Sequence, residues 1–140
     1  MSEGKLAQEL YQSGYSCAEA AWLAMAKDLS DKEKNFGLKL SGGFGGGVGC
    51  GSVCGALAGA VLGLGAFLGR EQGEPRPDQL RAITKQLAES FAAKFGSVDC
   101  SSIKPVGDNY RERCAEYVVF AVEEALRLLD EALESDDDCG

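Results

Sequence analysis

The sequence contains no histidine, which removes the commonest general base and the commonest nitrogen ligand for metals. Ser/His and Cys/His pairs are therefore excluded, and any nucleophile must be activated by a helix end, a cation or a metal. No two cysteines have the C-x-x-C spacing, which argues against a thioredoxin-type dithiol and against a zinc ribbon. The chain also lacks a basic segment followed by an apolar core at its start, so we expect a cytoplasmic protein.

Basic residues are outnumbered by acidic ones, and the 140-residue chain has a net charge of −8. This charge argues against binding to nucleic acid or to an anionic membrane surface, because both would repel the protein.

The length is typical of one domain. We expect a single helical domain over residues 1–134, followed by an acidic disordered tail over residues 135–140. Four acidic side chains crowd this end: Glu134, Asp136, Asp137 and Asp138.

Apolar residues recur at helical spacing, and no segment shows the alternation of a strand. We therefore predict an all-α protein, a bundle of five or six helices around a central glycine-striped helix that follows a glycine-rich loop. Ser16, Ser30, Ser52 and Asp78 are the expected N-caps. The predicted helices cover residues 5–13, 17–29, 31–40, 53–68, 78–95 and 110–133.

Residues 40–69 carry no charged side chain. Residues 42–49 are mostly glycine and predict a loop, because glycine loses the most backbone freedom in a helix or strand. The loop matches neither G-x-G-x-x-G nor a Walker A motif, so nucleotide binding is the weakest alternative. The helix over residues 53–68 is shorter than the roughly 20 residues of a membrane span. We therefore expect a buried central helix and no membrane span.

Gly55, Gly59 and Gly63 recur every four residues, so they lie on one face of this predicted helix. A face of glycines lets another helix approach closely. We expect this face to serve close packing inside the domain or the interface of a homodimer.

Cysteine is abundant, with six residues at positions 17, 50, 54, 100, 114 and 139. In a reducing compartment such a set is typical of catalytic, metal-binding or redox-sensing sites. Cys54 falls in the first turn after the expected cap Ser52, where the helix end should stabilise a thiolate and lower the pKa of the thiol. Cys17 has the same place in its own helix. Cys50 lies in the glycine loop, and its geometry relative to Cys54 is undetermined.

Bundled helices could bring Cys17, Cys54, Cys100 and Cys114 together. Four convergent thiolates would hold zinc or an iron–sulfur cluster. Two convergent pairs would form reversible disulfides. The spacing alone does not separate these outcomes.

The chain resembles a family of redox-active proteins named for its cysteine pattern, a cysteine followed by C-G-A-x-x-G and two further cysteines. The segments that carry this resemblance are Gly14–Ala20, Gly42–Gly47, Cys54–Gly59, Phe95–Cys100 and Cys114. The resemblance extends over roughly residues 5–130. It implies that Cys17, Cys54, Cys100 and Cys114 are the four shared cysteines, whereas Cys50 and Cys139 are additional. It also implies a link to transporters, because genes of the family often lie near transporter genes.

These observations predict a cytoplasmic thiol-redox or electron-transfer protein, possessing at most a thiol-oxidoreductase-like activity. Cys54 would be the thiolate, with Cys17, Cys100 and Cys114 as resolving partners and Cys50 as an auxiliary partner. Lys39 or Arg70 could assist as a cation, but no spacing selects either. The alternatives are a zinc or iron–sulfur protein that uses the same four cysteines, and a non-catalytic interaction module associated with a transporter.

Overall fold

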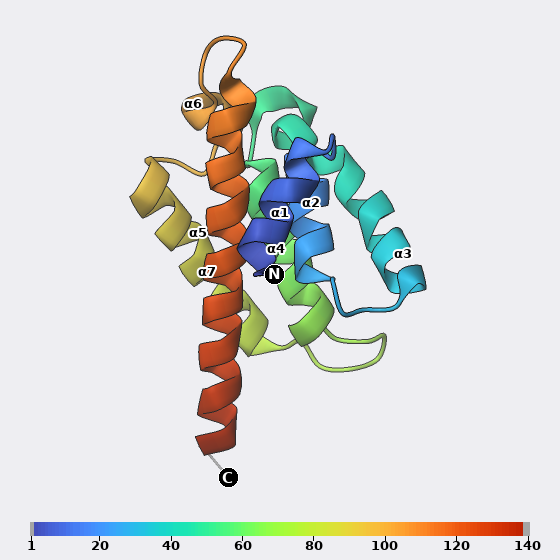
Figure 1. Ribbon diagram of the computed structural model, residues 1–140. Coiled ribbons are helices and arrows are strands. Elements are labelled where there is room, and N and C mark those ends of the chain that lie inside the picture. Colours follow the sequence, from blue (N-terminus) through green and yellow to red (C-terminus); the bar gives the residue numbers. More distant parts are fainter. Residues whose placement is uncertain (1, 139–140) are drawn as a thin grey trace.

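The computed structural model describes residues 2–138, and these residues form seven α-helices and no strand (Figure 1). This confirms the all-helical prediction. The count exceeds the expected five or six because Cys100–Ile103 forms a helix of a single turn. In order, the helices are α1 Glu3–Gln12, α2 Cys17–Met25, α3 Asp31–Ser41, α4 Gly55–Leu68, α5 Asp78–Phe95, α6 Cys100–Ile103 and α7 Tyr110–Asp138.

The two predicted capping boxes are present. The Glu19 N–H donates to Ser16 Oγ at 3.2 Å, and the Ser16 N–H donates back to the Glu19 carboxylate at 2.9 Å. Ser30 and Glu33 form the same reciprocal pair at the start of α3. These local bonds satisfy backbone donors that a helix start leaves unpaired, which is why the sequence alone locates both starts.

Helix α2 ends at Met25, before the predicted end at Leu29. The Ala26 N–H donates to the Trp22 carbonyl at 2.9 Å, and a separate turn follows in which the Leu29 N–H donates to Ala26. The indole N–H of Trp22 donates to the Lys34 carbonyl at 2.9 Å. Trp22 therefore ties α3 to α2 across this connection.

The glycine-rich segment contains two short turns, η1 Gly42–Phe44 and η2 Gly47–Gly51. The backbone of η2 is irregular, with φ of +61° at Val48 and +71° at Gly49. After η2 the chain does not enter α4 at once. Helix α4 begins at Gly55, and its N-cap position is held by Cys54. The predicted cap at Ser52 was therefore wrong.

Helix α4 lies at the centre of the bundle, and its glycine face packs on α2. A Cβ atom on Gly59 would lie 2.4 Å from the Ala18 carbonyl oxygen, and one on Gly63 would lie 2.5 Å from Met25 Cβ. Gly55, Gly59 and Gly63 are all buried. This face is thus covered inside the chain, which confirms close packing inside the domain, one of the two roles expected for it.

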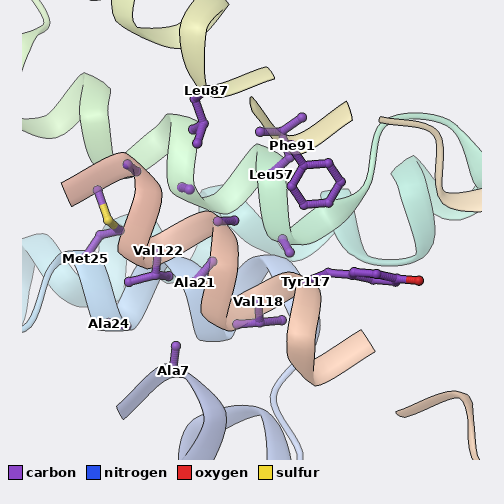
Figure 2. Close-up of a cluster of buried hydrophobic side chains, with 14 of the residues drawn as sticks. Ala7, Ala21, Ala24, Met25, Leu57, Leu87, Phe91, Tyr117, Val118 and Val122 are labelled. Atoms are coloured by element: carbon purple, nitrogen blue, oxygen red, sulfur yellow. The ribbon is translucent and has the colours of Figure 1, made fainter. Parts of the chain in front are cut away.

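The core lies where α4, α2, α5 and α7 meet (Figure 2). Four alanines of α2 are fully buried and allow α4 to approach: Ala18, Ala20, Ala21 and Ala24. Larger side chains fill the space between α5 and α7. Phe91 packs edge-on against Tyr117 with ring centroids 6.1 Å apart, and Phe95 lies 4.6 Å from the same ring. These contacts hold the two longest helices together.

The later helices differ from expectation mainly at their ends. Helix α5 begins at Asp78, with Pro77 at the N-cap position in place of the predicted cap. Gly96 ends α5 in a left-handed conformation, with φ of +96°, as glycine readily does. Helix α7 continues through Asp138, beyond the predicted end at Leu133. Cys139 lies outside the described residues.

Among helices of the described chain, none has both the length and the apolar character needed to span a membrane.

Candidate functional site

Four of the cysteines lie at or near the beginnings of helices that start at the same end of the bundle (Figure 1). Cys17 is the first residue of α2, and Cys54 directly precedes α4. Cys100 is the first residue of α6, and Cys114 follows the start of α7 by four positions. The local fold therefore delivers one cysteine from each of four elements to one region.

A short backbone pairing joins the segments around Cys54 and Cys100. Val53 and Asp99 form an isolated antiparallel bridge. The Cys54 N–H donates to the Val98 carbonyl, and the Cys100 N–H donates to the Ser52 carbonyl, both at 2.7 Å. Two segments far apart in the sequence are thereby held side by side, each with its cysteine.

Cys17 lies against the start of α4. A Cβ atom on Gly55 would come within 2.4 Å of the Cys17 sulfur, and within 3.0 Å of the Phe44 carbonyl oxygen. Only glycine leaves room for the thiol here. Since Gly55 directly follows Cys54, this contact brings the Cys17 sulfur beside the residue that carries the second thiol.

The Cys54 thiol is buried, with 5% of the residue exposed. Burial raises the pKa of Cys54 to about 12, and negative charge at Cys17 or Cys100 acts in the same direction. The N–H groups of Ala56 and Leu57 at the helix start oppose this rise, but they form no full cap hydrogen bond with the sulfur. The predicted lowering of this pKa was wrong, because desolvation outweighs the helix end.

Cys100 and Cys114 are partly buried, and burial raises the pKa of both thiols. Charge at Cys17 raises both values further, whereas the ammonium group of Lys104 lowers them. Cys17 thus lies near enough to Cys54, Cys100 and Cys114 for negative charge on its sulfur to raise the pKa of each.

Tyr11 of α1 is a further side chain close to the cysteines. It is almost fully buried, and burial raises the pKa of its phenol well above the usual range. The phenol lies near Cys114 and acts to lower the pKa of that thiol, against the larger rise caused by burial. The Arg111 guanidinium lies 4.1 Å from the centre of the Tyr11 ring and donates to the Tyr11 carbonyl at 2.8 Å. In the sequence, Tyr11 shows only the signal of a core position on an amphipathic helix.

Lys104 is the second site residue that the sequence does not reveal. It follows Cys100 by one helical turn, and its ammonium group lies 4.5 Å from the centre of the Tyr110 ring. This is the cation that acts on the cysteines. Neither Lys39 nor Arg70, the two cations considered from the sequence, appears among the charges that shift the cysteine pKa values.

Cys50 stands apart from the four. It is exposed on η2, where its thiol donates to the Gly47 carbonyl at 3.6 Å. The η2 turn packs on α6, since a Cβ atom on Gly51 would lie 2.9 Å from Ser101 Cβ. Cys50 is therefore near α6 but open to solvent.

The four cysteines do not fit a resident metal in this conformation. Within residues 2–138, no three cysteine, aspartate or glutamate side chains are placed together so that they could hold a metal ion. The arrangement brings thiols near one another without forming a closed tetrahedral site.

These features describe an all-helical protein with four cysteines at or near helix starts at one end of the bundle. The chain matches the family model described as "Putative redox-active protein (C_GCAxxG_C_C)" over residues 15–128, and it belongs to that family. The family is named for G-C-A-x-x-G and not for C-G-A-x-x-G as expected, and this chain has Cys54-Gly55-Ala56 at that place. No curated protein and no solved structure gives a match.

Proposed function

We propose that this protein carries out thiol–disulfide exchange with Cys17, Cys54, Cys100 and Cys114. The observation that carries the proposal is the placement of the four cysteines, since backbone pairing holds the Cys54 and Cys100 segments side by side and the Cys17 sulfur lies against Gly55. Membership of a redox-active family supports the same chemistry without naming a reaction. The proposal places the protein in the reducing cytoplasm, where the thiols would be regenerated between cycles.

The exposure of the thiols suggests a division of roles. Cys54 is buried and cannot meet a large oxidant, whereas Cys100 is partly exposed. Burial raises the pKa of Cys100, and the ammonium group of Lys104 offsets part of this rise, which favours the attacking thiolate. We assign Cys100, for its exposure, as the first thiol to react, and Cys17, whose sulfur lies against the start of α4, as the thiol that resolves the mixed disulfide.

The exchange needs an external disulfide, either of a small thiol compound or of a partner protein. The Cys100 thiolate attacks one sulfur of that disulfide, a mixed disulfide forms, and one partner thiolate leaves. The Cys17 thiolate then attacks the Cys100 sulfur and releases the second partner thiolate. Two cysteine thiols are oxidised to one disulfide, the partner disulfide is reduced to two thiols, and the two protons pass to the leaving thiolates. Cys54 can then exchange with the Cys17 sulfur inside the protein.

The test is a redox titration of the full chain in glutathione or dithiothreitol buffers, followed by peptide mapping of the disulfides. We expect a reversible two-electron transition with a disulfide among the four cysteines. Cys17→Ser should remove the transition or change the pair that forms. Cys50→Ser is the matched control and should leave the transition in place.

The proposal fails if no disulfide forms among the four cysteines across potentials from roughly −320 to −120 mV. It also fails if Cys17→Ser and Cys50→Ser titrate alike. Zinc or an iron–sulfur cluster on the same four cysteines remains the alternative from the sequence. Stoichiometric zinc, or visible absorption with stoichiometric iron after anaerobic purification, would favour that alternative over exchange.

A further inference from the structure

A cavity of about 570 Å³ lies between the C-terminal half of α4 and the beginning of α5. These parts of α4 and α5 lie at the opposite end of the bundle from the starts of α2, α4 and α7 (Figure 1). Its floor is apolar and includes Val61, Leu62 and Leu80. Three of the six arginines of the chain line it. We call this cavity the arginine groove, and its arginines are Arg70, Arg76 and Arg81.

The three arginines are exposed, and none of them forms a salt bridge with a carboxylate in the part of the chain that the structure describes. Arg70 donates only to the Glu74 carbonyl, at 3.2 Å. In a protein with a net charge of −8, three unpaired guanidinium groups around one apolar floor are unusual. The groove therefore suits an occupant that is both apolar and acidic.

The apolar surface continues beyond the groove. Leu62 also lines a second cavity of about 290 Å³ that lies between α3 and α4. Phe36 and Leu40 on its wall are 64% and 52% exposed. The outer face of α4 is thus uncovered between α3 and α5, which is room for one further helical segment.

The same chain presents a helical segment of matching character. Helix α7 projects past the other helices at its C-terminal end (Figure 1). Leu129 is 6% exposed, whereas Leu133, one turn later, is 48% exposed. The apolar stripe of α7 therefore continues past the point where the bundle covers it. We call residues 130–138 the α7 extension; its acidic residues are Asp130, Glu131, Glu134, Asp136, Asp137 and Asp138.

We propose that the arginine groove binds the α7 extension of a second copy of this chain. In its own chain the extension is held beside α5 and not in the groove, because α7 is one continuous helix and the Gln79 side chain donates to the Ala132 carbonyl at 3.4 Å. The end of α4 and the start of α5, which line the groove, lie at the same end of the molecule as the end of α7 (Figure 1). Two copies can therefore exchange their extensions reciprocally, and such a contact closes as a symmetric dimer.

The chemistry of the extension favours this occupant over a membrane. In the proposed dimer Asp130 and Glu134 would face Arg76 and Arg81, and Leu133, which is 48% exposed, would anchor on the apolar floor of the groove. A second copy and an anionic bilayer both carry negative charge, so the net charge of −8 opposes either; the second copy differs in that it offers acidic residues and an exposed leucine on one helix. The dimer is independent of the proposed thiol chemistry, since it uses the opposite end of the bundle.

The test is the molar mass of the full chain in solution, measured by light scattering and sedimentation from about 1 to 200 µM with a reductant present. The reductant prevents Cys139 from joining two chains through a disulfide. We expect dimers at low salt and a dissociation constant that rises as salt screens the charges. Arg76→Glu with Arg81→Glu should raise this constant at least tenfold, and so should Asp130→Arg with Glu134→Arg.

Mixing the two double variants gives the sharpest result. In a dimer of either variant alone, the groove and the extension carry like charges at both contacts. In a heterodimer of the two variants, the groove and the extension carry opposite charges at both contacts. We expect the mixture to regain dimers that neither variant forms alone. The control is Lys5→Glu with Lys32→Glu, which makes the same charge change on exposed residues outside the groove and should leave the dimer unchanged.

A wild-type chain that is monomeric throughout this range would overturn the proposal. Dimers that persist unchanged in both double variants, or a mixture that stays monomeric, would overturn it as well. Binding of monomers to vesicles that contain anionic lipid, lost on Arg76→Glu with Arg81→Glu and without any dimer, would assign the groove to a membrane surface instead.

Discussion

The sulfur of Cys17 rests against the backbone of Gly55, so closely that a Cβ atom on Gly55 would lie 2.4 Å from it. Gly55→Ala should therefore displace the thiol and destabilise the protein by about 1–3 kcal/mol, as overpacking commonly does. Urea unfolding in the presence of a reductant measures this loss.

The same substitution tests whether the sulfur is the cause. In a Cys17→Ala background the sulfur is gone, so Gly55→Ala should cost clearly less than in the wild type. If Gly55→Ala lowers the free energy of unfolding equally in the two backgrounds, the Phe44 carbonyl, and not the thiol, is the group that excludes a Cβ atom at residue 55.

The glycine face of α4 offers a matched pair of substitutions. Gly59→Ala would bring a Cβ atom within 2.4 Å of the Ala18 carbonyl oxygen and within 2.8 Å of Ala21 Cβ, so we expect a loss of several kcal/mol or failure to fold. Gly65→Ala meets no atom within 4 Å and should stabilise the helix by up to about 1 kcal/mol. Thermal unfolding of the two variants should move in opposite directions.

Stability should fall at alkaline pH because of Cys54. Its pKa in the folded chain is about 12, above that of an exposed thiol, so the folded chain holds this proton more tightly than the unfolded chain. The contribution is complete below about pH 8.5 and is lost as the pH rises toward 12, to a total of roughly 4 kcal/mol. Other groups titrate in the same range, so the measurement compares the wild type with Cys54→Ala from pH 7 to 11. Parallel curves for the two proteins would contradict the expectation.

Alkylation rates should separate the cysteines. Cys50 is exposed and should react with iodoacetamide at a rate typical of a free thiol, whereas Cys54 is 5% exposed and should react at least 100-fold more slowly. Peptide mapping at successive times gives both rates in one sample. Addition of urea above the unfolding midpoint should make the two rates similar, and a fast Cys54 in the native protein would show that its burial is not maintained in solution.

Local signals in the sequence predicted much of the helical framework. The capping boxes at Ser16 and Ser30 use residues three positions apart, and the apolar face of α5 follows from spacing along one helix. Both depend on neighbours in the chain, so no tertiary contact is needed to infer them. The cysteine pattern also identified the family that the match over residues 15–128 shows.

Two predictions failed because they depended on contacts between distant segments. Ser52 does not cap α4, because the pairing of Val53 with Asp99 keeps this segment out of the helix, which begins only at Gly55. The pKa of Cys54 is raised because neighbouring elements bury it, although its place before a helix predicts the opposite. Of the two roles expected for the glycine face, packing inside the domain is the one that the contacts with α2 show.

The sequence by itself determined that the chain is helical, where the helices carry their apolar faces, and to which family the chain belongs. Only the tertiary structure decided that the Cys17 sulfur lies against Gly55, that Cys54 is the buried thiol, and that Lys104 lies near enough to lower the pKa values of Cys100 and Cys114. Helix starts depend on residues a few positions apart, whereas desolvation and charge act through space. A thiol's reactivity is therefore set by whatever segment the fold places over it.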